Sequence, residues 1–271
     1  MSYKLSVITI NFNDKLGLEN TIKSVVSQSY KGFEFVVIDG NSTDGSKDIL
    51  NLHKDSFQYC VSEPDHGIYN AMNKGIKAAT GDYLIFMNSG DTFYDDTVLE
   101  NMEPYLNGCT DFVYGNSYFF TDIEFIRIEK PPQLLNFDYF EKLGLNQQAV
   151  FMRRNLFFDT FLFNEEYKIS ADWEFFIVNI CLNNSTYLYI DRIVCRYNIV
   201  GVSSFPENQK IFWAERDRTF QKYFPVYYKY EQILKKYRSK RFMQFEQISE
   251  RKISWKIMRA ILNVFMLFIK K

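Results

Sequence analysis

The stretch SEPDHGIYNAMNKGIKAATGDYLIFMNSGD, Ser62–Asp91, contains a predicted helix, a predicted strand and a polar strand end. The apolar run Asp82–Met87 predicts a strand, and small or polar residues follow it as far as one carboxylate, Asp91. A helix that buries one face on a sheet is predicted before it by small and apolar residues at helical spacing: Ile68, Ala71, Met72, Gly75, Ile76 and Ala79. The stretch is therefore typical of an α/β fold.

Further apolar runs extend this pattern toward both ends of the chain. With Asp82–Met87 they predict a mainly parallel central sheet that is buried on both faces and flanked by helices. These runs are Leu5–Ile10, Glu34–Asp39, Phe57–Ser62 and Asp111–Gly115. In such a sheet the ligand crevice lies at the carboxyl ends of the strands.

Polar residues follow three of these strands, at Asn11–Asp14, Asp39–Gly45 and Asn88–Asp91. Because parallel strands end at one edge of the sheet, we expect the three clusters to converge there. The sequence has neither G-x-G-x-x-G after the first strand nor a G-x-x-x-x-G-K-[ST] motif. The usual dinucleotide fold and the P-loop are therefore not supported.

Composition limits the class of protein. A chain of 271 residues with 46% hydrophobic residues has ample material for a packed core. Four separated cysteines and two histidines argue against a structural zinc site and favour reduced thiols in the cytoplasm. The first residues, MSYKLSVITINFN, lack the pattern of a signal peptide. We therefore expect a cytoplasmic protein.

The charge is unevenly distributed along the chain. Residues 222–271 contain 13 Lys or Arg against 3 Asp or Glu, whereas residues 1–221 contain 19 basic against 30 acidic side chains. This contrast predicts a basic helical tail, 222–271, after a domain of residues 1–221.

Four segments resemble the inverting family 2 glycosyltransferases, which have the GT-A fold, over roughly residues 3–205. They are VITINFN (Val7–Asn13), VVIDGNSTDGS (Val36–Ser46), the opening stretch and ADWEFF (Ala171–Phe176). The resemblance looks closest to the branch that assembles bacterial surface polysaccharide. It implies that residues 1–116 bind a nucleotide-diphosphate sugar and that 117–221 form the acceptor half. It also implies transfer of one sugar, with inversion, to a carbohydrate, lipid-linked acceptor.

Asp91 stands where the family holds a divalent metal on the diphosphate. Departure of a nucleoside diphosphate leaves negative charge, which Mn²⁺ or Mg²⁺ can neutralise. Such ions often need only one or two protein carboxylates, with phosphate and water as the other ligands. Many relatives place a second aspartate where Asn88 or Ser89 stands here. The alternative is a simple turn in which Asp91 caps the next helix.

The resemblance assigns donor binding to residues at the strand ends and the predicted helix. Asp39 would accept a hydrogen bond from the base or ribose, or else form an Asx-turn. Gly67 would permit close backbone approach. Asn73 and Lys74 lie opposite the apolar helix face, which is equally typical of a solvated face. The predicted donor-binding residues are Thr9, Asn11, Asp39, Asp65, Gly67, Asn73, Lys74 and Ser89.

The acceptor hydroxyl needs a general base, and Asp172 is the candidate. Apolar residues at helical spacing after Asp172 predict a buried helix that Ser170 would cap, so that Asp172 lies in its first turn. Glu174 would point away from Asp172. The alternative is that Asp172 only complements the helix dipole.

Two further segments carry predictions from the resemblance. Gln147 occupies a position where relatives often have histidine. The loop Val200–Phe205 resembles a mobile segment that closes over the nucleotide, and its glycine and serines would permit that motion.

The C-terminal residues predict an amphipathic helix with one basic stripe. Its apolar run Val264–Ile269 is far below the roughly 20 residues that span a bilayer. We therefore expect peripheral contact with anionic lipid on the inner face of the cytoplasmic membrane, strengthened by the basic segment Lys235–Arg241. Packing on a partner chain or on the body of the protein is the alternative. No stacking or groove-reading motif supports nucleic-acid binding.

Two other functions remain open on the sequence. A nucleotide-sugar binding protein without turnover would suit the missing second aspartate and Gln147, although both Asp91 and Asp172 are present. A nucleotidyltransferase would want a glycine-rich, basic loop after the first strand, and NFNDKLGLEN (Asn11–Asn20) has little of either.

Overall fold

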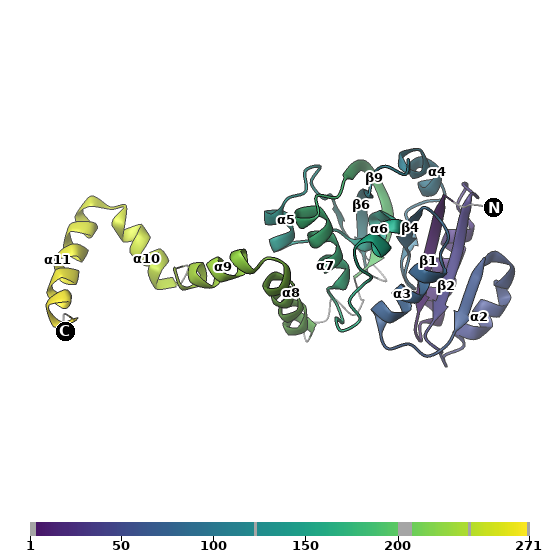
Figure 1. Ribbon diagram of the computed structural model, residues 1–271, viewed down its shortest axis with the longest axis horizontal. Coiled ribbons are helices and arrows are strands. Elements are labelled where there is room, and N and C mark those ends of the chain that lie inside the picture. The colour runs from purple at the N-terminus through teal and green to yellow at the C-terminus, as the bar shows by residue number, and fades with distance from the viewer. Residues whose placement is uncertain (1–3, 122–123, 200–207, 238–239, 270–271) are drawn as a thin grey trace. The chain divides into compact units, whose positions relative to one another are not determined.

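The computed structural model describes residues 4–121, 124–199, 208–237 and 240–269 (Figure 1). The chain divides into two compact units, Met1–Arg216 and Asp217–Lys271. The boundary falls within helix α8 (Gln209–Tyr223), five residues before the position expected from charge. Each unit is described by itself.

The first unit alternates strands and helices through its first hundred residues. Its elements before α8 are, in chain order, β1 (Leu5–Asn11), α1 (Lys15–Val26), β2 (Phe33–Asp39), α2 (Ser46–Leu52), η1 (Lys54–Ser56), β3 (Tyr59–Ser62), α3 (Ile68–Ala78), β4 (Tyr83–Phe86), β5 (Thr92–Phe93), α4 (Val98–Met102), η2 (Glu103–Tyr105), β6 (Phe112–Phe120), β7 (Phe125–Glu129), α5 (Phe137–Lys142), η3 (Gln147–Ala149), β8 (Val150–Arg153), α6 (Arg154–Asp159), α7 (Ala171–Ile177), η4 (Val178–Leu182) and β9 (Tyr187–Asn198).

The described residues form one nine-stranded sheet in the order β3-β2-β1-β4-β8-β6-β9-β5, with β7 paired to β6. The first four strands are parallel, so Asn11 and Asp39 are directly paired at one edge. β8 is antiparallel to both β4 and β6. The sheet is therefore mixed, and its first half has the predicted parallel order.

The sequence predicts a mainly parallel sheet, and the structure confirms it: β1 to β4 are parallel, while β8 lies between β4 and β6 and runs against both. One detail of the predicted sheet was wrong. Burial on both faces fails at β3, whose four residues are exposed or only half-buried. Among the described strands β3 is the outermost, paired with β2 alone, and so lacks the cover that central strands receive.

Helix α3 packs on one face of the parallel strands, as the spacing of its apolar residues predicts. The contact is close at Gly75, where an added Cβ would lie 2.5 Å from Cγ2 of Ile8 in β1. The opposite face of the sheet is covered by α1, and Leu18 and Ile22 of that helix belong to the same buried core as Val7. The sheet is thus enclosed between two helical layers, which fixes where the strand ends lie.

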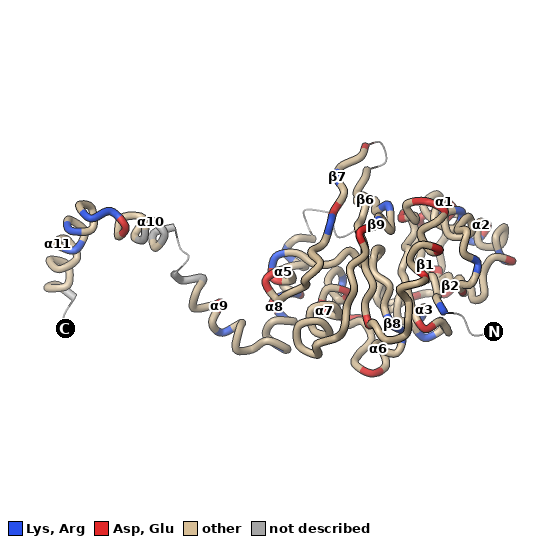
Figure 2. The backbone as a smooth tube through the Cα atoms, turned by 90° about the horizontal axis from the view of Figure 1, so that it is seen from above, with Lys and Arg blue, Asp and Glu red and all other residues tan. Residues whose placement is uncertain are grey.

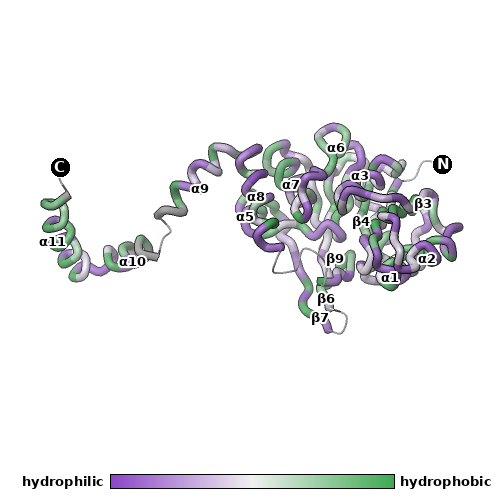
Figure 3. The backbone as a smooth tube through the Cα atoms, turned by 90° about the horizontal axis from the view of Figure 1, so that it is seen from below, coloured by the Kyte–Doolittle hydropathy of each residue, from purple (hydrophilic) through white to green (hydrophobic). Residues whose placement is uncertain are grey.

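The second unit contains the end of α8 and the helices α9 (Pro225–Tyr237), α10 (Lys240–Ser249) and α11 (Lys252–Ile269). None of the described helices has both the length and the apolar content needed to cross a bilayer. α11 carries three basic side chains and no acidic one, visible as blue segments in Figure 2. Figure 3 shows most of this helix in the green of hydrophobic residues, and Leu267 and Phe268 are 77% and 83% exposed.

The close packing at Gly75 can be tested with Gly75→Ala. Overpacking of a filled core typically costs about 1–3 kcal/mol, more than the roughly 1 kcal/mol that alanine gains over glycine in a helix. We therefore expect a lower free energy of unfolding in urea titrations. Lys77→Ala, on the exposed side of the same helix, should change stability by less than about 0.5 kcal/mol. Equal stability of the two variants would contradict the close α3–β1 contact.

Candidate active site

The polar strand ends converge as the sequence predicts. Asn11 Nδ2 donates to Asp39 Oδ1 at 2.7 Å, and Ser89 Oγ donates to Asn11 Oδ1 at 2.8 Å. Ser42 and Ser62 also donate to the carboxylate of Asp39. The ends of four parallel strands, directly or through their following loops, are therefore joined in one hydrogen-bond network.

Asp39 is the centre of this network and is fully buried. Burial alone would raise the pKa of Asp39, but the hydrogen bonds from Ser42, Ser62 and Asn11 outweigh it and lower the pKa below its ordinary value. Asp39 is therefore ionised at neutral pH and already has several hydrogen-bond donors.

Asp65 lies beside the end of β2. A Cβ added to Gly40 would be 2.5 Å from Asp65 Oδ2 and 3.0 Å from the ring of Phe12. Asp65 also accepts from the backbone N–H of Gly67, whose φ of 122° is in the region that favours glycine. Asp65, Gly67 and Phe12 thus lie next to the strand-end network.

Three of the predicted donor-binding residues make hydrogen bonds or an ion pair within the protein. Thr9 is fully buried and donates to the carbonyl of Met87, which follows β4. Asn73 is 2% exposed, and its amide bonds both backbone groups of Phe163. In this structure the polar groups of Thr9 and Asn73 therefore contact protein, and their role in donor binding stays a prediction. Lys74 forms an ion pair with Glu63 at 2.8 Å and donates to the carbonyl of Pro64.

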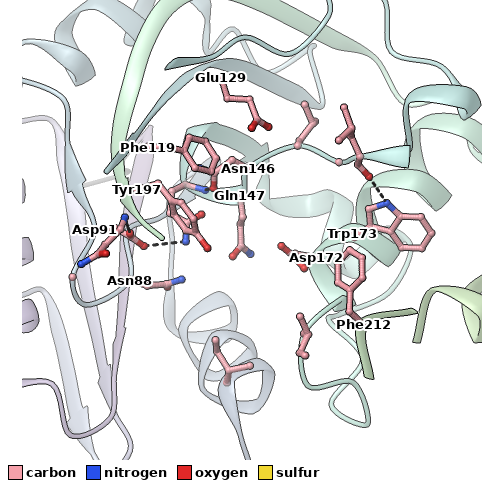
Figure 4. Close-up of a pocket in the computed structure, with 18 of the residues that line it drawn as sticks. Asn88, Asp91, Phe119, Glu129, Asn146, Gln147, Asp172, Trp173, Tyr197 and Phe212 are labelled. Atoms are coloured by element: carbon pink, nitrogen blue, oxygen red, sulfur yellow. Dashed lines mark hydrogen bonds between the residues drawn. The ribbon is translucent and has the colours of Figure 1, made fainter. Parts of the chain in front are cut away.

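A cavity of about 800 Å³ opens beside this network (Figure 4). Asp91 and Asp172 both line it, with Gln147 between them in the view of Figure 4. Ser89 also lines the cavity. The remaining predicted donor residues are not among its lining residues: Thr9, Asn11, Asp39, Asp65, Gly67, Asn73 and Lys74. The structure therefore brings the two key acids together, eighty-one positions apart in the sequence.

Asp91 reaches the cavity from the end of β4. The next element is β5, and the next helix begins only at Val98, so Asp91 does not cap a helix. Its carboxylate accepts from Gln148 Nε2 at 3.0 Å and from the backbone N–H of Asn198 at 3.1 Å. Burial raises the pKa of Asp91 to about 7, against these hydrogen bonds, and the nearby Asp14 adds to the increase.

The residues around Asp91 suit a divalent cation. Among the described residues no three His, Cys, Asp or Glu side chains form a metal site. However, Oδ1 of the cavity-lining Asn88 is buried without a hydrogen-bond partner among the residues that the structure describes. One carboxylate and one amide oxygen match an ion whose other ligands are phosphate and water. A cation would also relieve the repulsion between Asp14 and Asp91.

Asp172 lies in the first turn of α7 and is partly exposed to the cavity. Tyr69 donates to Asp172 Oδ1 at 2.9 Å from helix α3. Burial raises the pKa of Asp172 above its usual value, although Tyr69 and the positive charge of Arg216 act in the opposite direction. A carboxylate with a raised pKa is a better proton acceptor than a fully solvated one.

The hydrogen bonds at the start of α7 differ from the prediction that the Ser170 side chain caps this helix. Ser170 is at the N-cap position, but its hydroxyl makes no cap hydrogen bond. The carboxylate of Glu215 instead accepts from the backbone N–H groups of Lys168, Ile169 and Ser170. A long-range carboxylate therefore satisfies the backbone donors before the helix. Glu174 is buried and does not line the cavity, so it diverges from Asp172 as expected.

Several contacts in the cavity were missed by sequence reasoning. Tyr69 was not among the residues of the predicted buried helix face. Gln148, Glu215 and Arg216 belong to no motif used above. Gln147, at the family's histidine position, is 4% exposed and its amide lies 3.7 Å from the sulfur of Met72. Local patterns carry no signal for such contacts, because each joins elements distant in sequence. The loop Val200–Phe205 lies outside the described residues.

Known structures with similar folds share this architecture. A crystal structure of Staphylococcus aureus TarS superposes with a TM-score of 0.63 at 18% identity, covering 80% of this chain and 64% of that chain. A mannosyltransferase from Pyrobaculum calidifontis, in complex with GDP-Man and Mn²⁺, superposes with a TM-score of 0.61 at 15% identity, covering 81% and 63% of the two chains. This chain thus spans about two thirds of each structure, and these likenesses confirm the GT-A-type fold.

Sequence comparison establishes the family. An uncharacterized glycosyltransferase of Mycobacterium tuberculosis is 33% identical over 212 residues, or 77% of this chain and 80% of the relative. A "PGL/p-HBAD biosynthesis glycosyltransferase" of Mycobacterium bovis is 30% identical over 82% of this chain and 84% of the relative. The model of glycosyl transferase family 2 matches residues 6–161, more than half of the sequence. With the GT-A-type fold and a cavity lined by Asp91 and Asp172, this chain belongs to glycosyltransferase family 2.

Proposed function

We propose that the protein transfers one sugar from a nucleotide-diphosphate donor to a carbohydrate acceptor, with inversion at the anomeric carbon. The observation that carries this proposal is that Asp91 and Asp172 line one cavity from the two halves of the fold. A donor diphosphate near Asp91 would place its sugar between the two acids. The acceptor would then approach from the side of Asp172.

The proton transfer follows from this arrangement. Asp172 takes the proton of the acceptor hydroxyl while that oxygen bonds to the anomeric carbon and the bond from carbon to the diphosphate breaks. Attack from the side opposite the leaving group inverts the configuration. Asp91 and Asn88 would hold a divalent metal, which neutralises negative charge on the departing diphosphate.

The residues at the strand ends support a nucleotide sugar as donor, and its base and sugar are left open. The TarS structures include complexes with UDP and UDP-GlcNAc, and the Pyrobaculum enzyme binds GDP-Man with Mn²⁺. In this chain Phe12, Asp65 and the glycine at position 40 lie side by side at the end of β2, where a base and ribose would fit. The proposed donor is therefore a nucleoside diphosphate sugar that is used with Mn²⁺ or Mg²⁺.

The acceptor is proposed from the relatives. One is named for PGL/p-HBAD biosynthesis, and a "putative teichuronic acid biosynthesis glycosyltransferase" of Bacillus subtilis is 32% identical over 36% of this chain. We therefore place this chain in bacterial surface polysaccharide synthesis, acting on a lipid-linked acceptor. A non-catalytic nucleotide-sugar binding protein is the second candidate, because Asn88 or Ser89 stands where the resemblance implies a second aspartate.

Helix α11 supports contact of the protein with a membrane surface. Its apolar side chains are uncovered: Ile253, Ile257, Ile261, Val264, Phe265, Leu267 and Phe268 are all at least 46% exposed. Its only charged side chains in the described part, Lys252, Lys256 and Arg259, are basic. Such a helix lies in the interface of anionic lipid. We propose that it holds the protein at the inner face of the cytoplasmic membrane.

Transfer can be tested directly with a panel of UDP- and GDP-sugars, with and without Mn²⁺, by measuring released nucleotide. We expect one donor class to be hydrolysed or transferred only in the presence of the metal. Donor binding without any turnover, with every sugar and a range of lipid-linked acceptors, would favour the non-catalytic alternative.

Asp172→Asn should separate chemistry from binding. The amide cannot take a proton, so we expect transfer to fall about 10²–10⁴-fold while calorimetry shows unchanged donor affinity. Asp91→Asn should instead lose the metal dependence of donor binding. Asp55→Asn, in an exposed turn away from the cavity, is the control and should behave as wild type. Normal transfer by Asp172→Asn would refute the base assignment.

Membrane contact can be measured by flotation of the full chain with vesicles of phosphatidylglycerol or phosphatidylcholine. We expect binding to the anionic vesicles only, and at least a tenfold loss for the double change Phe265→Glu and Phe268→Glu, because each buried phenylalanine contributes about 1.5–3 kcal/mol. Leu52→Glu, an equally apolar and 72% exposed site at the end of α2, should bind normally. Equal loss in both variants would argue against a specific role of α11.

A further inference from the structure

The hydrogen bond between Tyr69 and Asp172 joins the two halves of the fold at the cavity. Tyr69 is in the first turn of α3, within the proposed donor-binding half, and is 4% exposed. Its hydroxyl donates to Asp172 Oδ1 at 2.9 Å, and both residues line the cavity. A tyrosine hydroxyl that donates to one oxygen of a carboxylate leaves the other oxygen for a second donor.

Hydrogen bonds from Asn70 and Asn73 hold the part of helix α3 that carries Tyr69. Asn70 donates to Glu165 at 2.8 Å, and Asn73 also donates to Glu165 at 2.8 Å. Asn73 in addition exchanges two hydrogen bonds with the backbone of Phe163. The segment that leads into α7 is thus bound to the same helix that carries Tyr69. The direction of the hydroxyl is therefore set by three neighbouring contacts rather than by one flexible side chain.

Arg216 supplies the nearby positive charge without contacting the carboxylate. Its guanidinium lies 4.3 Å from the ring centre of Trp173 and 4.2 Å from that of Phe212, and it donates to the carbonyl of Leu143. Among the described residues it forms no ion pair, and it is 4% exposed. It therefore acts on Asp172 through space, and within the described part of the chain Tyr69 alone makes a directed side-chain bond to Asp172.

The other charged residues near Asp172 are Glu215, Glu174 and Lys168. Glu215 accepts three backbone N–H groups before α7, and Glu174 is buried away from the cavity. Lys168 is exposed at the cavity rim. Burial raises the pKa of Asp172, and the bond from Tyr69 is the foremost influence that lowers it again.

We propose that Tyr69 is a positioning residue that keeps Asp172 ionised and turns its second oxygen toward the acceptor hydroxyl. This role rests on the proposed function, because it supposes that Asp172 is the base. Loss of the hydroxyl removes a donor to the charged form only, so protonated Asp172 becomes relatively more stable. The pKa of Asp172 then rises, and a base that must be ionised works only at higher pH.

Tyr69→Phe tests the hydrogen bond directly. In protein labelled at the aspartate side-chain carboxyl carbon, the Asp172 signal is assigned by its loss in Asp172→Asn and followed by NMR through a pH titration. A bond to a charged group is expected to shift the pKa of Asp172 upward by about one to two units when lost. An unchanged pKa would overturn the inference, whether or not Asp172 is the base.

The pH profile of kcat/KM tests the catalytic consequence. In Tyr69→Phe its acid limb should move to higher pH by the same amount, with transfer lowered below that pH and donor KM unchanged. Tyr114→Phe is the matched control, since Tyr114 is also fully buried and donates to a carbonyl, that of Pro132, but does not line the cavity. Its acid limb should coincide with that of wild type. An equal shift in the control would mean a general effect of destabilisation and would overturn the role of Tyr69.

A second variant covers the case in which phenylalanine does not fold. Replacement of Tyr69 by 3-fluorotyrosine keeps the ring and makes the phenol a stronger donor, so the acid limb should move to lower pH. A limb that does not move, or that moves upward, would overturn the inference. If the NMR shift occurs in Tyr69→Phe but the acid limb stays in place, the bond exists while Asp172 is not the base. That result would refute the proposed base and, with it, the catalytic role of Tyr69.

Discussion

The hydrogen bonds to the carboxylate of Asp39 are the interactions on which the strand-end edge of the sheet depends. The carboxylate accepts from Asn11 at the end of β1, from Ser62 at the end of β3 and from Ser42 in the loop after β2. Asn11 in turn accepts from Ser89, beyond β4. Hydrogen bonds to a buried charge each contribute about 1.5–3 kcal/mol, and a lost partner leaves that charge unsatisfied. The loop that carries Asp91 is therefore positioned through a buried network as well as by its strand.

Much of the first half could be predicted from the sequence. Local periodicity identified α3 and the first four strands, and the convergence of their polar ends follows from parallel pairing alone. Asp91 and Asp172 could be selected from the family motifs, and the cavity contains both. These features can be predicted because each depends on residues that are neighbours in the sequence or that lie at the sheet edge where the parallel strands end.

The second half depends on pairings that local patterns do not contain. β9 has Asp191 and Arg192 in its middle and register shifts against β6, so its alternation is broken. Thr9 and Asn73 are of the right residue types for a ligand site, yet their partners are Met87 and the backbone of Phe163. Whether a polar side chain contacts ligand or protein depends on which other segments of the chain pack against it. For Asn73 the contacting segment is the backbone at Phe163, ninety residues later in the chain.

The position of β8 has a consequence for how the chain acquires this sheet during synthesis. β8 (residues 150–153) separates β4 from β6, so β6 has no neighbour toward the first four strands until residue 153 has been made. The first four strands can pair from contiguous chain as it leaves the ribosome, whereas β6 must wait for a strand that enters between it and β4. The cavity lined by Asp91 and Asp172 thus lies at a seam between an early-formed and a late-formed part of the same protein.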